Sequence, residues 1–188
     1  METWVQEWLD HFVRFYRAQN FFEKYAALSD AEFADLLMRW YAAAWAQPLD
    51  PSEFVTELRL LSSDETRVWW RDLHANVARG KNVYVTVLQA WSAIARGKFL
   101  PDEISETWDS EQGPIALAFL LDDEKVRVYP RPMGDEIDLG ILPPINRLIE
   151  KTGVEFCAHE VFAETGYVIA VTEKEKIQLE LRGWKWEV

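Results

Sequence analysis

The stretch that decides the fold class covers residues 113–129 and reads GPIALAFLLDDEKVRVY. Its continuous apolar run over 115–121 is bounded by Gly-Pro on one side and Asp-Asp on the other, which is typical of a buried strand. The alternating residues 126–129 are predicted to form the hairpin partner of that strand. Because the residues before about 100 carry helical periodicity instead, the sequence predicts an α+β protein.

Downstream of this hairpin, a similar order of elements is expected once more. A double proline at 143–144 begins a predicted helix, and alternating residues over 154–161 and 167–171 predict a second hairpin. A capping box at 172–175 begins the last expected helix. Residues 105–188 are therefore predicted to form a small four-stranded, mainly antiparallel sheet with two helices, in the order ββαββα.

Residues 1–100 are predicted to form an aromatic-rich helical bundle. Apolar side chains recur there at helical spacing, and we expect five or six helices, among them residues 29–46, 62–80 and 82–96. Capping boxes begin the first two of these three helices, because a serine is followed three positions later by a glutamate. This bundle and residues 105–188 form either two domains or one compact unit.

The aromatic side chains of the helical region have more than one interpretation. Trp4, Trp8, Phe12 and Phe15 step by four, four and three positions, so they share one helical face. Burial in a core is favoured for such a stripe, and a partner-binding face is the alternative. A further alternative is a small-ligand-binding protein or unrecognised enzyme with an aromatic pocket between the helical and sheet regions. The residues expected to line that pocket are Trp69, Trp70, Tyr84 and Trp91.

The chain has a formal net charge of −12, most of which lies in its second half. Residues 98–188 carry 10 Lys and Arg against 19 Asp and Glu, and residues 99–124 contain eight acidic residues without a Lys or Arg. Such a field repels nucleic acid and anionic membranes and attracts basic partners, although acidity also serves solubility. We therefore expect no nucleic-acid partner and no membrane partner.

The acidic stretch is the candidate binding site. A tryptophan within a charged rim is a common hot-spot arrangement, and the acids at 103, 106 and 109 are expected to share a face of a short helix. The predicted partner-binding residues are Asp102, Glu103, Glu106, Trp108, Asp109 and Glu111. In size, acidity and lack of catalytic motifs, the chain resembles small acidic bacterial immunity or inhibitor proteins. The leading hypothesis is thus a non-enzymatic interaction protein that docks on a basic protein.

Evidence for catalysis or for a bound cofactor is weak. The dinucleotide-binding, Walker A, nucleophile-elbow and zinc-protease motifs are all missing from the sequence. Cys157 and His159 share a strand face with Glu155, but a zinc site needs more ligands than this part of the sequence offers. We therefore expect no metal and no cofactor, and we lean against enzymatic activity.

The compartment is predicted from three features of the sequence. The chain has one cysteine, so it cannot form an internal disulfide framework. Its first residues are acidic and do not resemble a signal peptide. Its apolar runs are shorter than the roughly 18 residues of a membrane span. A cytoplasmic location is expected from these features.

Overall fold

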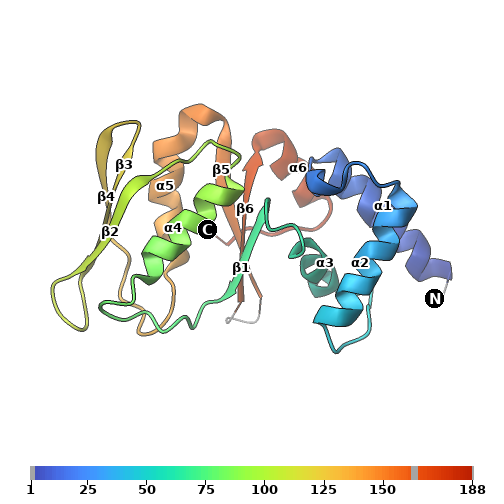
Figure 1. Cartoon of the computed structure of the whole chain (residues 1–188), viewed down its shortest axis with the longest axis horizontal. Coiled ribbons are helices and arrows are strands. Elements are labelled where there is room, and N and C mark those ends of the chain that lie inside the picture. Colours follow the sequence, from blue (N-terminus) through green and yellow to red (C-terminus); the bar gives the residue numbers. More distant parts are fainter. Residues whose placement is uncertain (1–2, 162–164, 188) are drawn as a thin grey trace. The chain divides into compact units, whose positions relative to one another are not determined.

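The computed structural model describes residues 3–161 and 165–187, and the chain divides into two compact units, residues 1–68 and 69–188 (Figure 1). The boundary therefore lies earlier than the position near residue 100 that the sequence predicted. The reason is that residues 69–99 supply a strand and a helix to the core of the second unit.

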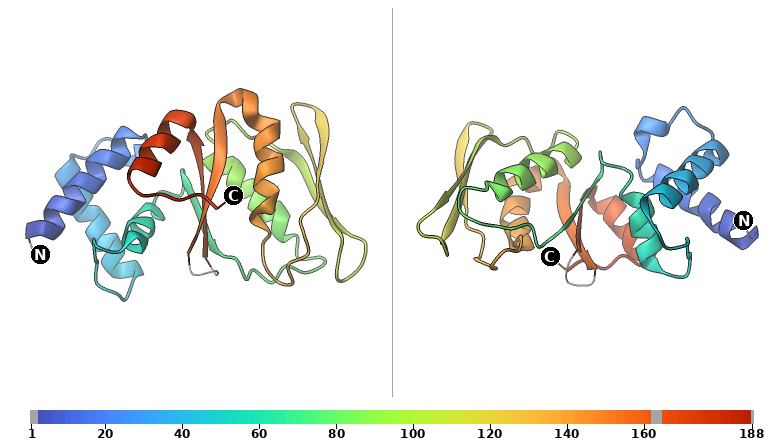
Figure 2. Two further views of the ribbon diagram at one scale, coloured as in Figure 1. Left: turned by 180° about the vertical axis from the view of Figure 1, so that it is seen from behind. Right: turned by 60° about the horizontal axis from the view of Figure 1, so that its bottom comes forward.

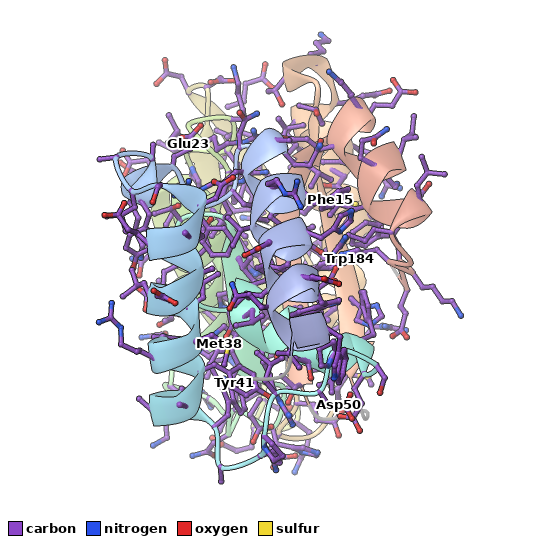
Figure 3. All side chains as sticks on the ribbon, turned by 90° about the vertical axis from the view of Figure 1, so that its right-hand side faces the viewer. Phe15, Glu23, Met38, Tyr41, Asp50 and Trp184 are labelled. Atoms are coloured by element: carbon purple, nitrogen blue, oxygen red, sulfur yellow. The ribbon has the colours of Figure 1, made fainter. Side chains whose placement is uncertain are left out.

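The first unit is helical. Its helix α1 packs against α2, and α2 packs against α3. Side chains fill the space between α1 and α2 (Figure 3), and the buried ones include Phe12, Tyr16, Phe33 and Tyr41. Trp4 is half exposed, so the aromatic stripe of α1 is only partly a core stripe. The elements are α1 (Thr3–Ala18), the 3-10 turn η1 (Glu23–Tyr25), α2 (Asp30–Ala44) and α3 (Phe54–Leu61).

The helix expected over residues 62–80 is wrong, because tertiary contacts hold this segment in another conformation. Ser62 ends α3, and its hydroxyl donates a hydrogen bond to the carbonyl of Arg59. The carboxylate of Asp64 accepts a hydrogen bond from the backbone N–H of Phe22. Arg67 donates to the carbonyl of Asn20 at 2.6 Å. These contacts fix the chain as it leaves α3 and enters strand β1 (Val68–Asp72).

The second unit contains two three-stranded sheets, with strand orders β1-β6-β5 and β2-β3-β4. The α+β class is confirmed, but the single four-stranded sheet with order ββαββα is not. The sequence pattern missed β1 and β2, which lie in segments expected to be helical. The remaining elements are α4 (Val83–Ile94), β2 (Asp102–Trp108), β3 (Ile115–Leu121), β4 (Glu124–Val128), the turn η2 (Leu139–Ile141), α5 (Leu142–Ile149), the turn η3 (Glu150–Thr152), β5 (Val154–Val161), β6 (Thr165–Thr172) and α6 (Glu173–Leu181).

Helices cover both faces of the β1-β6-β5 sheet (Figures 1 and 2). Phe156 of β5 belongs to the main core, where its ring lies 5.9 Å from that of Trp91 on α4. Helix α5 adds Ile145 and Ile149 to this core. Alternate residues of β5 point to the opposite face, where Glu155 pairs with Lys176 of α6. Strand β5 is therefore an edge strand with α5 on one side and α6 on the other.

The β2-β3-β4 sheet contains the predicted hairpin, which is formed by β3 and β4. β3 pairs antiparallel with both β2 and β4, and its residues alternate between buried and half-buried along its length. Helix α4 packs against β2 on the buried side of this sheet. In residues 3–161 and 165–187, no helix is long and apolar enough to cross a lipid bilayer.

Candidate functional site

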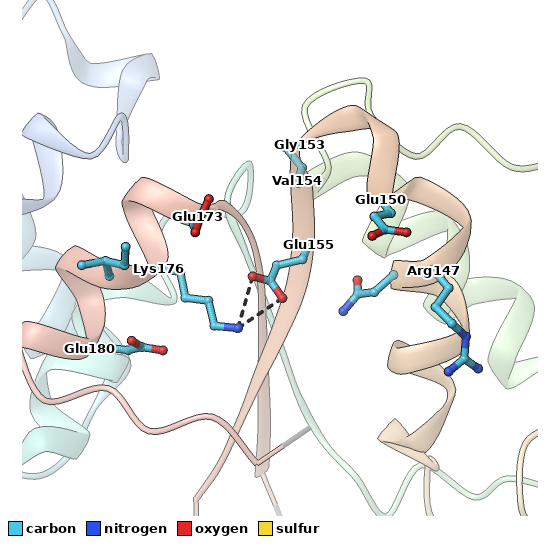
Figure 4. A pocket seen from close by; sticks show the side chains of 10 residues that line it. Arg147, Glu150, Gly153, Val154, Glu155, Glu173, Lys176 and Glu180 are labelled. Carbon is cyan, nitrogen blue, oxygen red and sulfur yellow. Dashed lines mark hydrogen bonds and ion pairs between the residues drawn. The ribbon is translucent and has the colours of Figure 1, made fainter.

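A groove of about 800 Å³ lies over the edge strand β5, between α5 and α6 (Figure 4). Val154 and Ile177 supply apolar surface to it, and Ile177 is 47% exposed. Four carboxylates and two cationic groups surround this apolar surface. They are Arg147, Glu150, Glu155, Glu173, Lys176 and Glu180. The groove therefore combines accessible apolar area with a net negative rim.

Helix α6 sets the positions of the acids on one side of the groove. Thr172 and Glu175 form the predicted capping box, with each side chain accepting a backbone N–H of the other residue. This fixes the start of the helix, so Glu173, Lys176 and Glu180, three and four positions apart, share one side. Glu175 itself is buried and accepts two hydrogen bonds from Arg96 at 3.0 and 2.8 Å.

Helix α5 supplies the other side of the groove. Its prolines lie in the first turn, where a backbone N–H would have no helical partner. Ile145 and Ile149 turn toward the core, while Arg147 and Glu150 are exposed at the groove. One side of this short helix thus builds the core, the other carries Arg147, and Glu150 follows directly after the helix in η3.

Some charged groups of the groove already have hydrogen-bond or ion-pair partners within the chain, and others do not. The ammonium of Lys176 lies 3.1 Å from the carboxylate of Glu155. Burial opposes the charged form of Lys176, but nearby negative groups, including Glu155, outweigh it and raise its pKa. Glu180 accepts a hydrogen bond from the indole of Trp186 at 2.9 Å. Glu150 and Glu173 have no hydrogen-bond or ion-pair partner among the described side chains, so both can pair with a cation from outside.

The backbone edge of β5 is closed by contacts within the chain. The side-chain amide of Asn146 donates to the carbonyl of Phe156 at 2.8 Å and accepts its N–H at 2.7 Å. These are the two hydrogen bonds that a neighbouring strand would make at that residue. Two positions further on, the carbonyl of Ala158 accepts the N–H of Glu187 at 3.1 Å. Pairing of this kind protects an edge strand from adding another chain.

The predicted partner-binding stretch lies in strand β2, so the expected short helix with acids on one face is wrong. Glu106 has two internal partners, the N–H of Tyr84 at 2.9 Å and the indole of Trp108 at 2.7 Å. It therefore accepts a hydrogen bond in the first turn of α4, where a carboxylate is favourable. Trp108 packs partly buried against the core. These two residues support the fold in this structure.

The other acids of this stretch are exposed. Glu103 sits with a positive φ of 47° at an irregularity in the register of β2 with β3. The cross-strand pairs Asp102–Leu120 and Leu121–Glu124 place five carboxylates at one end of the sheet. These are Asp102, Glu103, Asp122, Asp123 and Glu124, referred to below as the hairpin carboxylates. Asp109 and Glu111 follow the opposite end of β2, and Glu111 lies 3.4 Å from Arg79.

The aromatic residues proposed for an alternative pocket lie within the second unit. Tyr84 and Trp91 are fully buried in its core, and Trp69 is nearly so. The rings of Trp69 and Trp91 meet edge to face, with their centroids 5.8 Å apart. Trp70 stacks on Tyr167. Their contacts are those of core packing.

Cys157 and His159 share a face of β5 with Glu155, as expected, but each has its own local environment. Burial raises the pKa of the Cys157 thiol to about 12. Nδ1 of His159 lies 2.6 Å from the carbonyl of Lys185. Within the described ranges, His, Cys, Asp and Glu nowhere form a group of three or more that could hold a metal ion.

A polar network around the buried carboxylate of Asp138, which the sequence pattern did not indicate, organises the loop before α5. The carboxylate of Asp138 accepts the backbone N–H of Arg131 at 2.7 Å and that of Gly140 at 2.9 Å. The guanidinium of Arg131 donates to the same carboxylate at 2.7 Å. The hydroxyl of Tyr84 accepts the N–H of Asp138. This network borders a second cavity of about 330 Å³.

The groove over β5 is suited to holding a partner by charge and apolar contact. Its unpaired carboxylates can accept hydrogen bonds from cations, and Ile177 offers apolar contact. Comparison of the chain with protein-family models, curated proteins and solved structures finds no match.

Proposed function

We propose that this chain is a non-enzymatic, cytoplasmic interaction protein that docks on a basic protein partner through the acidic surface of residues 69–188. The observation that carries the proposal is the groove over β5, where Glu150 and Glu173 flank exposed apolar surface. A protein interface usually has an apolar centre and a polar, solvent-accessible rim. Binding of the immunity or inhibitor type, in which the acidic chain masks a basic partner, is the most concrete form of this function.

The hairpin carboxylates and Asp109 have a separate part in this proposal. All six are exposed. Strand β2 contributes no cation beside Asp102, Glu103 and Asp109, whereas β4 carries Lys125 and Arg127 directly after the other three. Exposed charges outside an interface core act mainly on the encounter rate and on its salt dependence. We assign to them the attraction of the basic partner, while the groove holds it. Glu106 and Trp108 are left out of the contact set because both have structural partners.

The proposal is tested by affinity capture from the native cell lysate, with wild-type chain and charge-reversed variants as bait. One variant carries Asp102→Lys, Glu103→Lys and Asp109→Lys, and the other carries Glu150→Lys and Glu173→Lys. We expect the wild type to retain a basic protein at 50 mM salt and to lose most of it at 300 mM. Both variants should retain less of that protein.

The unfolding curves of the variants serve as the control, because exposed carboxylates can be reversed with little effect on the fold. A retained protein that is acidic would contradict the proposal. So would a basic one that binds equally well at both salt concentrations and to both variants.

A further inference from the structure

We infer that the groove over β5 takes a basic amphipathic helix of the partner, rather than an extended segment added to the sheet. The inference rests on the proposed function, because it names the partner element that the same acidic surface would hold. Two observations carry it: the closed backbone edge of β5 and the arrangement of apolar and acidic groups on α6 and directly after α5, in η3.

The first observation removes strand addition as the binding mode. An added strand needs a row of free N–H and C=O groups along the edge it joins. On β5 the amide of Asn146 occupies both backbone groups of Phe156. Glu187 occupies the carbonyl of Ala158, and the hydroxyl of Thr152 lies 3.4 Å from the N–H of Val154. A partner therefore meets side chains in this groove.

The second observation concerns what those side chains offer. Ile177 lines the groove and is 47% exposed. Leu181 lies four positions later on α6, so it continues this apolar stripe beyond the groove lining, and it is 78% exposed. Glu173 and Glu180 stand on the same helix, and Glu150 begins the turn η3, directly after α5, across the groove. Carboxylates thus lie on both sides of the groove, and Figure 4 shows Glu173 and Glu180 on one side and Glu150 on the other.

An amphipathic helix with cationic flanks is complementary to this pattern. Its apolar residues at i, i+4 and i+7 form a stripe that can face Ile177 and Leu181. Its Lys or Arg side chains on either side of the stripe would reach Glu150 on one side and Glu173 on the other. An extended segment presents only alternate residues to one face, so it would place fewer cations beside the acids on the two sides of the groove.

The test uses two synthetic peptides of identical Leu and Lys composition, each labelled with fluorescein, and the full chain. One peptide has Leu at helical spacing, and the other alternates Leu with Lys. Binding is measured by fluorescence anisotropy at 50 mM salt. Because both peptides carry the same charge, non-specific attraction to an acidic protein is the same for both. We expect the helical peptide to bind about tenfold more tightly.

Variants locate the binding surface. Ile177→Asp should weaken binding of the helical peptide about tenfold, since it places a charge on the apolar stripe. Glu173→Lys should weaken it several-fold. Glu65→Lys makes the same charge change at an exposed site in the first unit and serves as the matched control, with less than about a twofold effect expected.

Each outcome distinguishes the inference from the function it rests on. If the alternating peptide binds as tightly as the helical one, or if Ile177→Asp and Glu173→Lys act no more strongly than Glu65→Lys, the inference is wrong and the acidic interaction surface lies elsewhere. If neither peptide binds at 50 mM salt, the proposed attraction of basic partners is itself wrong.

Discussion

Replacement of Asp138 by alanine should strongly destabilise the second unit. Asp138 is 4% exposed, and its carboxylate holds two backbone N–H groups, those of Arg131 at 2.7 Å and Gly140 at 2.9 Å. Removing the carboxylate leaves both donors without their acceptor. Both hydrogen bonds are partly buried, so the loss of each costs about 0.5–1.5 kcal/mol, and Asp138→Ala should lower the free energy of unfolding by about 1–3 kcal/mol.

Two comparisons separate this mechanism from simple loss of an ion pair. Arg131→Ala removes the guanidinium, whose side chain is 71% exposed, but leaves the two backbone donors satisfied. It should therefore destabilise the chain clearly less than Asp138→Ala. Urea unfolding followed by both tryptophan fluorescence and far-UV circular dichroism is the assay, since two units need not unfold in one step. Equal effects of the two variants, or a loss below about 0.5 kcal/mol for Asp138→Ala, would refute the reasoning.

The pH dependence gives an independent check on Asp138. Burial alone would raise the pKa of its carboxyl, but hydrogen bonds from Arg131 and Gly140 outweigh it and lower the pKa. Because the folded pKa lies below the unfolded value of about 3.9, the ionised group stabilises the fold above that pH. This contribution is lost as the pH falls through the folded pKa. The stability difference between wild type and Asp138→Ala should thus shrink in acid below about pH 4.

Two further predictions follow from the β5 strand. Since burial raises the pKa of the Cys157 thiol to about 12, it should react with Ellman's reagent at pH 8 only after unfolding; rapid stoichiometric reaction of the native chain would disprove this. Asn146→Ala should lower the unfolding free energy by about 1–2 kcal/mol and promote concentration-dependent self-association in sedimentation velocity, because it opens the β5 edge at Phe156. A variant that remains as monodisperse as the wild type would show that Asn146 does not prevent another chain from pairing with this edge.

Local signals in the sequence predicted the parts of the fold that local contacts determine. The capping box of Ser29 and Glu32 begins α2, and that of Thr172 and Glu175 begins α6, both as expected. In each case the two side chains satisfy the backbone of residues only three positions away. Such contacts can be predicted from a few neighbouring residues, so the start of each helix can be located without knowing the rest of the fold.

The same signature at Ser62 and Glu65 gave a wrong prediction, because distant partners determine that segment. The carboxylate of Asp64 accepts the backbone N–H of Phe22. The guanidinium of Arg67 donates to the carbonyls of Gln19 and Asn20, which precede Phe22 in the same loop. The strand that follows is completed by β6, about a hundred residues later in the chain. Tertiary pairing of this kind overrides local propensity, and a single sequence does not reveal it.

The sequence predicted that the candidate site would be acidic, but it did not predict which residues would form it. Composition located the acidic half of the chain, yet it could not distinguish a carboxylate free for a partner from one that is engaged. Glu106 bonds Tyr84 and Trp108 within the fold, whereas Glu150 and Glu173 remain available. The groove also joins residues from α5, β5 and α6, whose proximity depends on packing around an edge strand.

The placement of the aromatic residues determines what a partner has to bring to this surface. Interface hot spots favour Trp, Tyr and Arg in desolvated pockets. Here Trp91 and Trp184 are buried, and Trp108 donates a hydrogen bond to Glu106. The described lining of the groove offers aliphatic and charged groups, with acids in excess over cations. The anchoring side chains would then come from the partner. Carboxylates pair in bidentate fashion with arginine but only singly with lysine, so an arginine-rich partner helix fits the acids around Ile177 better than a lysine-rich one.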